Sequence, residues 1–362
     1  MTGMRVAYVV NVFPKLSETF IAGELAELRR RGVNLRVLSL QQPKETLRHD
    51  FIAQAELDKI TCYRPEEFAN VIREFEPQLL HAHFATEPTA AARELSERLG
   101  VPFTFTAHGY DIRRKAPPDL AARAAAARAV VTVSNANAHH IAETFGVALD
   151  RVEVIPCGVD TDRFRPVIGR DCPWTAGVPV IVCVARHVEV KNLGLLLQAC
   201  ALLRDCGMPF RCVMVGDGPL RCELEGMRRQ LNLERFIEFA GALEQLEVLK
   251  WWQHAAVAVL TSRNEGMPVC LMEAAACGVP AVATAVGGVP ELVEDGVTGL
   301  LTEPGDPEAV ASALAGLLAD QRLTSRLGKA ARQRAEDHFS VRRQANCLLD
   351  LWARVLEDKR RG

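Results

Sequence analysis

The sequence contains no apolar run that approaches the roughly 20 residues of a membrane-spanning helix, and it contains no Cys-x-x-Cys pair. Its 11 cysteines are an odd number, stand singly, and in several cases lie inside apolar segments. Such cysteines behave as small hydrophobic residues in a reducing compartment, whereas disulfide and zinc frameworks use paired spacings. We therefore expect a cytoplasmic protein without a membrane span, a disulfide framework or a bound metal.

The sequence also lacks an excess of charge of one sign. Its 43 basic and 45 acidic residues leave a formal net charge of −2, whereas nucleic-acid binders depend on clustered Lys and Arg. We expect no nucleic-acid partner. Two short basic runs occur at residues 29–31 and 113–115. A solvated helix end accounts for the first run, and both leave open a peripheral contact with the inner surface of a membrane.

The sequence does contain a repeated alternation of short apolar runs and helical patterns. The opening residues, MTGMRVAYVVNVF, have the pattern of a buried parallel strand rather than that of a signal peptide. The alternation continues to residue 155, and a second series starts at residue 180 after a segment rich in Pro, Gly and Asp. This predicts an α/β fold of two doubly wound domains facing a central cleft. We place them at residues 1–165 and 166–340, followed by a last helix within 341–362.

Residues 259–278, VLTSRNEGMPVCLMEAAACG, place two carboxylates around the start of a predicted helix at residues 268–277. A polar turn at residues 261–264 ends a buried strand, and Glu265 lies in this loop at the carboxyl end of the strand, where open α/β sheets bind ligands. The helix N-terminus that follows offers free N–H groups to an anion. Glu273 stands in an apolar part of the helix, so we expect it to be partly buried with a partner. Acidic side chains are also common in the first helical turn without any ligand.

Two cationic residues follow the first strand of the second series. Residues 184–192, VARHVEVKN, lead from that strand into a helix. Arg186 and Lys191 are therefore expected where a diphosphate would meet cationic side chains and helix N–H groups. A loop with ordinary surface charges has the same composition. The recurrence of anion-binding elements around one site favours the diphosphate interpretation.

Glycines follow two further strands of the second series, in Gly216-Asp217-Gly218 and in Gly287-Gly288. Glycine lets a backbone approach a ligand closely, and a plain turn has the same pattern.

Three histidines belong to strands of the first series. His108 follows an apolar strand and precedes a glycine, a position at the predicted cleft that suits a hydrogen bond to a substrate. His81 and His83 lie two residues apart on one strand and share a face, like a metal-binding pair. The sequence offers no evident third ligand at metal spacing, which favours a structural role for that pair.

Together these motifs resemble those of the retaining glycosyltransferases of family four, which have the two-domain GT-B fold. The resemblance rests on the E-x7-E element of Glu265 and Glu273, the basic pair, GDGP at residues 216–219, and EAAACGVPAVATAVGGVPELVEDGVTGLL at residues 273–301. It covers essentially the whole chain and is strongest over residues 154–318. The opening FPKLSETFI at residues 13–21 is similar to a subgroup that builds exopolysaccharides, including colanic-acid-type transferases.

The resemblance implies a UDP- or GDP-linked sugar donor, a glycan, glycolipid or small-molecule acceptor, and no cofactor. It implies that the first Rossmann-like domain binds the acceptor, that the second binds the donor, and that the last helix crosses back to the first domain. Arg186 and Lys191 would neutralise the donor diphosphate electrostatically, without a metal, and His108 would lie by the sugar and the reaction centre. The other expected donor contacts are Glu265 and the backbone of Gly266, Met267, Pro268 and Val269 for the sugar, Glu273 for the ribose, the loop at Gly216, and Gly241 and Leu243 for the base.

Two positions depart from the family pattern. The first loop lacks the adjacent glycines that many members use near the donor phosphate, so Ser17 or Thr19 is expected to contribute instead. Ser17 is also expected to cap the helix that follows this loop. Cys157 precedes Gly158 where Asn is common, which leaves the role of that residue open. No residue is a convincing covalent nucleophile, so we favour front-face attack with the diphosphate as the base.

Rival functions share this fold. A nucleotide-sugar 2-epimerase acts on one substrate without an acceptor. A phosphorylase needs a lysine that carries pyridoxal phosphate, and the sequence has no such setting. A non-catalytic sugar-nucleotide sensor is disfavoured because Arg186, Lys191, Glu265 and Glu273 are all present.

Overall fold

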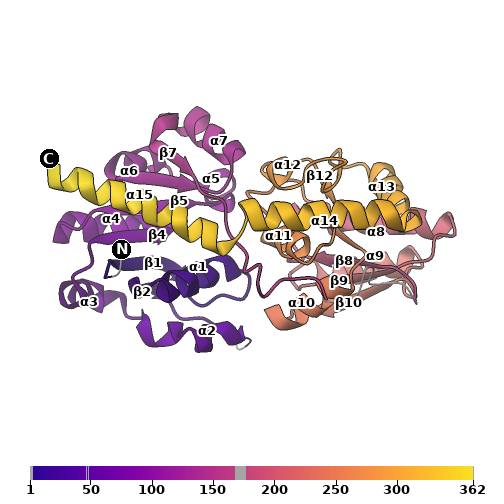
Figure 1. The fold of residues 1–362 in the computed structure, drawn as a ribbon, viewed down its shortest axis with the longest axis horizontal. Helices are drawn as coiled ribbons and strands as arrows, with labels where there is room; N and C mark the ends of the chain where they lie inside the picture. Colours follow the sequence, from indigo (N-terminus) through magenta and orange to yellow (C-terminus); the bar gives the residue numbers. More distant parts are fainter. Residues whose placement is uncertain (1–2, 46, 48, 168–176, 362) are drawn as a thin grey trace. The chain divides into compact units, whose positions relative to one another are not determined.

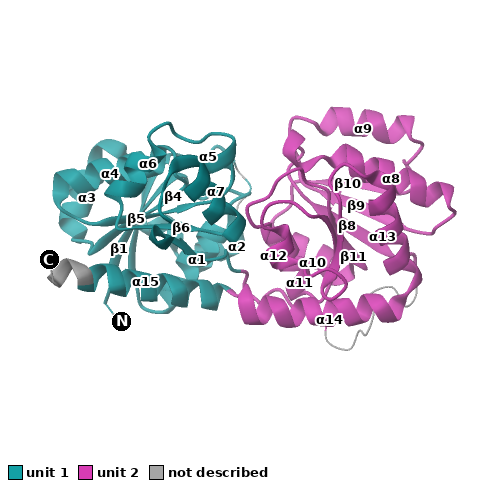
Figure 2. Cartoon of the chain, turned by 90° about the horizontal axis from the view of Figure 1, so that it is seen from above, with its two compact units in different colours: residues 1–158, 341–362 teal, residues 159–340 magenta. Residues whose placement is uncertain are grey.

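The computed structural model describes residues 3–45, 47, 49–167 and 177–361. The chain divides into two compact units (Figure 2): unit 1 comprises residues 1–158 and 341–362, and unit 2 comprises residues 159–340. The division falls a few residues before the boundary expected at residue 165, and part of the segment 156–179 lies outside the described residues. No helix of the described residues is long and apolar enough to cross a lipid bilayer.

Unit 1 is built on a seven-stranded parallel sheet in the order β3-β2-β1-β4-β5-β6-β7. The strands are β1 (Arg5–Val12), β2 (Asn34–Gln41), β3 (Thr61–Cys62), β4 (Leu79–His83), β5 (Phe103–Ala107), β6 (Ala129–Thr132) and β7 (Val152–Val154). The α-helices are α1 (Thr19–Arg30), α2 (Asp50–Gln54), α3 (Phe68–Phe75), α4 (Glu87–Leu99), α5 (Tyr110–Arg113), α6 (Leu120–Ala126), α7 (Asn135–Phe145) and α15 (Val341–Arg361). Short 3-10 turns stand at Leu57–Ile60, Pro65–Glu67 and Leu149–Arg151.

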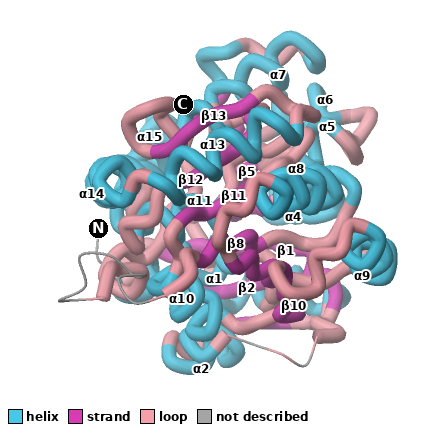
Figure 3. Tube along the Cα trace, turned by 90° about the vertical axis from the view of Figure 1, so that its right-hand side faces the viewer, coloured by secondary structure: helices cyan, strands magenta, loops and turns pink. Residues whose placement is uncertain are grey.

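Unit 2 repeats this plan with a six-stranded parallel sheet in the order β10-β9-β8-β11-β12-β13. The strands are β8 (Val180–Val184), β9 (Arg211–Val215), β10 (Ile237–Gly241), β11 (Val257–Leu260), β12 (Ala281–Thr284) and β13 (Gly299–Thr302). The helices are η4 (Glu189–Lys191, 3-10), α8 (Leu193–Asp205), α9 (Arg221–Gln230), α10 (Gln245–His254), α11 (Val269–Ala276), α12 (Val289–Leu292), α13 (Pro307–Ala319) and α14 (Gln321–His338). Figure 1 shows how strands and helices alternate along the chain, and Figure 3 shows the helices and the strands in different colours.

The strands are short and apolar because both faces of each sheet are covered by helices. In β1, Val6, Tyr8 and Val10 point to one core cluster, whereas Ala7 and Val9 point to the other. This alternation is the two-residue period of a strand. The first cluster includes apolar residues of α15, which packs beside α1 although the whole of unit 2 separates the two helices in sequence. The C-terminal helix therefore belongs to unit 1, as expected.

Candidate active site

Both sheets reverse their strand order at one place, and in unit 2 three of the predicted site residues follow the two strands next to that place. In unit 2 the reversal lies between the neighbouring strands β8 and β11. Arg186 and Lys191 follow β8, and Glu265 follows β11. Such a switch point, at the carboxyl ends of parallel strands, is where open α/β sheets bind ligands. The sheet order thus brings together two loops that are far apart in sequence.

Lys191, Glu265 and Ser262 form a compact charged cluster at this point. The Nζ atom of Lys191 and the Oγ atom of Ser262 each lie 2.5 Å from Oε1 of Glu265. Only 16% of the lysine side chain and 10% of the glutamate side chain are exposed. Burial by itself lowers the pKa of Lys191, but the Glu265 carboxylate together with Cys270 outweighs it, and the net shift is upward. The lysine is therefore held in its charged form.

Arg186 supplies a second cation beside this cluster. Its side chain is exposed, and no hydrogen bond or ion pair engages it within the described part of the chain. The positive charge of Arg186 repels that of Lys191 and acts to lower the pKa of that lysine. Two adjacent like charges are stabilised when an anion binds between them. The pair is thus suited to a ligand with more than one negative charge.

Glu273 is a buried carboxylate on α11, only 5% exposed. Its Oε1 atom accepts a hydrogen bond from Nε2 of Gln245 at 3.2 Å, and its Oε2 atom faces Nε1 of Trp252 at 3.4 Å. Burial raises the pKa of Glu273 to about 7, although these two donors and the charge of Arg163 act to lower it. A carboxylate that is kept close to its neutral form in this way is typical of functional sites.

The start of α11 has no side-chain cap. Pro268 occupies the N-cap position and makes no side-chain hydrogen bond to the first turn, whereas Ser134, Asp306 and Asp320 cap their own helices. The first N–H groups of α11 therefore keep donors available for a ligand. Gly266 and Met267 form the turn that precedes Pro268, and Met267 is buried at 8% exposure. Val269 begins the helix, so the expected helix at residues 268–277 is confirmed to within a residue at each end.

The glycine loops are shaped by neighbouring backbone. A Cβ atom on Gly216 would lie 2.0 Å from the carbonyl oxygen of Ala185, and one on Gly287 would lie 2.0 Å from the carbonyl oxygen of Glu265. Both glycines have positive φ, +131° and +52°. Each therefore lets its loop press against a loop that carries a predicted site residue. Gly241 ends β10 with φ of +75°, and Leu243 stands half-buried two residues later.

In unit 1 the predicted residue His108 ends a hydrogen-bonded chain of side chains. Its Nε2 atom lies 3.0 Å from Nδ1 of His83, whose Nε2 atom lies 3.1 Å from Oε1 of Glu24. Glu24 also accepts from the Tyr8 hydroxyl at 2.5 Å and from Nε2 of Gln344, on α15, at 2.6 Å. We call these five residues the histidine network. The loss of water around the half-buried His108 ring, and then His83, holds the pKa of His108 well below its usual value.

One expectation about unit 1 holds on different grounds, and another requires correction. The sequence offered no third partner for His81 and His83, but folding brings Glu24 close enough for the three to surround a cation. Each ring nitrogen already has a partner, since His81 bonds Thr104 and Thr106 and His83 belongs to the histidine network. The arrangement therefore fits a satisfied polar network.

The expectation that requires correction concerns Ser17. It is exposed and does not cap α1, whose N-cap residue is Glu18. The physical reason is that the backbone turns one residue later than the pattern indicated, with Glu18 N–H bonded to the carbonyl of Lys15.

Comparisons with known proteins fit this geometry. The family model described as "Glycosyl transferases group 1" matches residues 170–334, and that described as "Glycosyltransferase Family 4" matches residues 17–163. The GDP-mannose-dependent alpha-(1-6)-phosphatidylinositol monomannoside mannosyltransferase of Mycolicibacterium smegmatis is 31% identical over 286 residues, which are 74% of this chain and 74% of that protein. The chain belongs to the family-4 glycosyltransferases.

Two further relatives define the resemblance. The putative colanic acid biosynthesis glycosyltransferase WcaL of Escherichia coli is 35% identical over 207 residues, which are 55% of this chain and 50% of that protein. The chain also spans less than two thirds of the length of several other curated relatives. The crystal structure of Anabaena HepE in complex with UDP and glucose has a TM-score of 0.82 at 18% identity, over 97% of this chain and 99% of that chain. The predicted GT-B fold is thus confirmed.

Other features of this glycosyltransferase have structural explanations. Arg29, Arg30 and Arg31 pair with Glu56 or Glu27, and Lys115 pairs with Glu87. These ion pairs account for residues of both basic runs without a membrane.

The departure from the family pattern at Cys157 and one further motif also have structural explanations. Cys157 is buried at 3% exposure. The sequence also holds one Asp-x-Asp triplet, at residues 160–162. Oδ1 of Asp160 accepts from the backbone N–H groups of Asp162 and Arg163, which closes a local turn.

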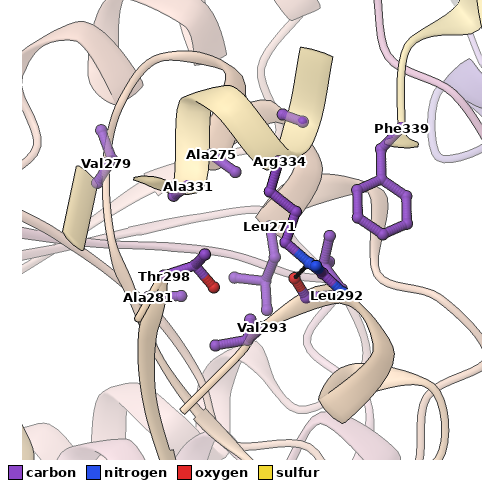
Figure 4. Close-up of a pocket in the computed structure, with 11 residues that line it drawn as sticks. Leu271, Ala275, Val279, Ala281, Leu292, Val293, Thr298, Ala331, Arg334 and Phe339 are labelled. Carbon is purple, nitrogen blue, oxygen red and sulfur yellow. Dashed lines mark hydrogen bonds between the residues drawn. The ribbon is translucent and has the colours of Figure 1, made fainter. Parts of the chain in front are cut away.

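The glycosyltransferase also has a small pocket within unit 2. It is lined mainly by aliphatic side chains of α11, α12, α14 and β12, with Arg334 across it (Figure 4). The guanidinium of Arg334 already donates to the carbonyl oxygens of Leu292 and Glu291, at 3.0 and 2.8 Å. The pocket offers no free charged group to a ligand.

Sequence reasoning missed several partners of the predicted residues. Ser262 was seen only as part of a polar turn, and Gln245, Trp252, Glu24 and Gln344 gave no signal. Apolar neighbours around Glu273 predicted that it needs a partner, but they could not say which. These contacts join residues 21 to 320 positions apart, except that of Ser262 with Glu265.

Proposed function

We propose that this chain transfers a sugar from a UDP- or GDP-sugar to a hydroxyl group of a glycan, glycolipid or small-molecule acceptor, with retention of configuration and without a metal. The observation that carries the proposal is the Lys191–Glu265–Ser262 cluster beside the exposed Arg186 at the switch point of unit 2. The names of the relatives support it, because one is GDP-mannose-dependent and another is assigned to colanic acid biosynthesis. We propose bacterial exopolysaccharide or lipopolysaccharide biosynthesis as its setting.

The diphosphate of the donor would lie against Arg186, Lys191 and the uncapped helix starts. Negative charge grows on the leaving diphosphate as its bond to the sugar breaks, so cations that are already in position lower the barrier. Arginine can bind two phosphate oxygens at once, whereas lysine acts as a point charge. The ion pair with Glu265 holds Lys191 in place before the donor arrives. Glu265 and the backbone from Gly266 to Val269 would hold the sugar.

The ribose of the donor would lie against Glu273. An ionised carboxylate accepts hydrogen bonds from both hydroxyl groups of a vicinal diol. Gln245 and Trp252 hold this carboxylate in place. The loop at Gly216 would follow the diphosphate, and the turn from Gly241 to Leu243 would border the base.

The reaction would proceed on one face of the sugar. The acceptor oxygen forms its bond to the anomeric carbon as the bond from that carbon to the diphosphate oxygen breaks. The proton of the acceptor hydroxyl passes to the departing diphosphate, which is the base. His108 of unit 1 would contact the transferred sugar. We place the protein in the cytoplasm, since the ten cysteines of the described residues are all free thiols.

Glu265→Gln tests the proposal directly. It keeps the size of the side chain and removes the charge that holds Lys191, so kcat/KM for acceptor-dependent nucleotide release should fall by about 100-fold or more. The matched control is Glu234→Gln, an exposed carboxylate that precedes β10 and therefore lies at the amino ends of the strands, at the edge of the sheet opposite the site. The control should keep its activity within about twofold.

Four outcomes would contradict parts of the proposal. A fully active Glu265→Gln variant would remove that residue from the site. Donor conversion without any acceptor would indicate a 2-epimerase. A trapped glycosyl-enzyme intermediate, or a product with inverted configuration by NMR, would exclude front-face retention.

A further inference from the structure

The histidine network gives His108 a defined set of neighbours. Glu24, His83, Tyr8 and Gln344 are all buried, with at most 6% of each residue exposed. Water therefore does not compete for their hydrogen bonds. Where every partner is a protein atom, the donor and acceptor roles along the chain can be assigned one after another.

Gln344 fixes which atoms donate and which accept at one end of the histidine network. Its Oε1 atom accepts from the backbone N–H of Gly158 at 2.8 Å, and that N–H can only donate. The NH₂ group of Gln344 therefore points at Oε2 of Glu24 and donates to it. The Tyr8 hydroxyl donates to Oε1, because burial, and then the charge of Glu24, raise the pKa of this phenol well above its usual value.

The assignment of hydrogen-bond donors and acceptors then extends from Glu24 through His83 to His108. A carboxylate only accepts, so Nε2 of His83 carries the proton that meets Oε1 of Glu24. In a neutral imidazole the other nitrogen is then an acceptor. Nδ1 of His83 accordingly accepts from Nε2–H of His108. Among the residues that the structure describes, Nδ1 of His108 has no hydrogen-bond partner. This atom is also not buried.

We propose that Glu24, His83 and Gln344 hold His108 as its Nε2–H tautomer, so that Nδ1 presents a lone pair to a hydroxyl group of the transferred sugar. The three are positioning residues, since they act through His108. The identity of the ligand rests on the proposed function, whereas the tautomer is a property of unit 1 alone. The proposal also gives α15 a role: Gln344, which follows unit 2 in sequence, completes a site in unit 1.

Glu24→Gln should reverse the tautomer. Gln344 still needs an acceptor opposite its NH₂ group, so the carbonyl oxygen of the new amide side chain takes that side. The NH₂ group of the new side chain then faces His83, whose Nε2 atom must become an acceptor. His83 donates through Nδ1, and His108 accepts at Nε2 and carries its proton on Nδ1. Long-range ¹H–¹⁵N correlation spectra report the tautomer, and a His108→Ala variant assigns the signals.

A double variant provides the rescue. In Glu24→Gln with Gln344→Glu, the carboxylate at position 344 accepts from Gly158 and from the amide of position 24. The carbonyl oxygen of position 24 then faces His83 again, and His108 should return to its Nε2–H form. Tyr8→Phe is the control, because it removes one donor to Glu24 and leaves the donor and the acceptor of every other hydrogen bond in the network unchanged.

Measurements of kcat/KM test the role of the tautomer in sugar transfer separately from its presence. Loss of one hydrogen bond to the sugar should lower kcat/KM about 10- to 100-fold in Glu24→Gln, and the double variant should recover to within about threefold of the wild type. A wild-type His108 with its proton on Nδ1, or an unchanged tautomer in Glu24→Gln, would overturn the network. A reversed tautomer with unchanged kcat/KM would overturn the role of Nδ1. If the wild type transfers no sugar, the proposed function fails, and NMR still decides the tautomer.

Discussion

Lys191 and Glu265 are 74 positions apart in the sequence and meet at 2.5 Å in the structure. Each was predicted to contact the donor, and the contact between them was not predicted. A strand-end position can be read from an apolar run and the turn after it. The order of the strands in the sheet decides which loop lies next to that strand end, and this order is not visible in the sequence. The β8–β11 adjacency supplies that information.

Glu273 makes a prediction about stability against pH. Its pKa is about 7 in the folded chain and returns to about 4.3 on unfolding. The folded state therefore binds this proton more tightly, so the stabilisation is fully present below about pH 4 and is lost as the pH rises through about 7. The loss amounts to roughly 4 kcal/mol. Glu273→Gln cannot ionise, so it should gain stability relative to the wild type between pH 5 and pH 8.

Urea unfolding of both proteins at several pH values measures this difference. The two free energies of unfolding should diverge with rising pH, with the variant more stable at pH 8. Parallel curves would show that Glu273 ionises as freely in the folded chain as in the unfolded one.

At the scale of elements, long periodic patterns were predictable and short ones were not. The strand at Arg5–Val12 lies within the opening residues that have a strand pattern, and the helix at Val269–Ala276 was expected within a residue of its observed ends. The segment with α2, the 3-10 turn at Leu57–Ile60 and β3 was not assigned. Its pieces have two to five residues, too few to show a helical or strand period. Such pieces are stabilised by packing against the sheet edge rather than by local sequence.

The loops between elements yield a prediction for Gly287. Alanine there would meet the carbonyl oxygen of Glu265 and would also hold a positive φ of +52°. The φ strain costs about 1 to 2 kcal/mol, and the clash with backbone adds to it. Gly287→Ala should therefore lose more than about 3 kcal/mol of stability and should weaken donor binding through Glu265.

Gly296→Ala is the matched control. Its φ is +71°, and nothing lies within 4 Å of the added Cβ atom. It should show the φ strain alone and unchanged donor binding. Equal losses of stability in the two variants would mean that the loop at Gly287 moves away from Glu265 without cost.

At the scale of the whole molecule, the two-unit plan followed from the restart of the strand–helix alternation near residue 180. The return of the last helix to unit 1 came from the family resemblance, because nothing in residues 341–362 names its packing partner. The structure supplies the reason for that return. Trp352 is fully buried against Tyr8 and His81, and Gln344 bonds Glu24.

The central claim is that unit 2 binds a nucleotide sugar through Lys191 and its neighbours. Thermal unfolding with UDP-, GDP-, ADP- and TDP-sugars tests it most directly, because a bound ligand stabilises the fold by about 2.7 kcal/mol at 100 times its Kd. We expect one nucleotide to raise the Tm of the wild type, and most of that rise to disappear in Lys191→Met. The absence of any rise in the wild type, or an equal rise in the variant, would contradict the account.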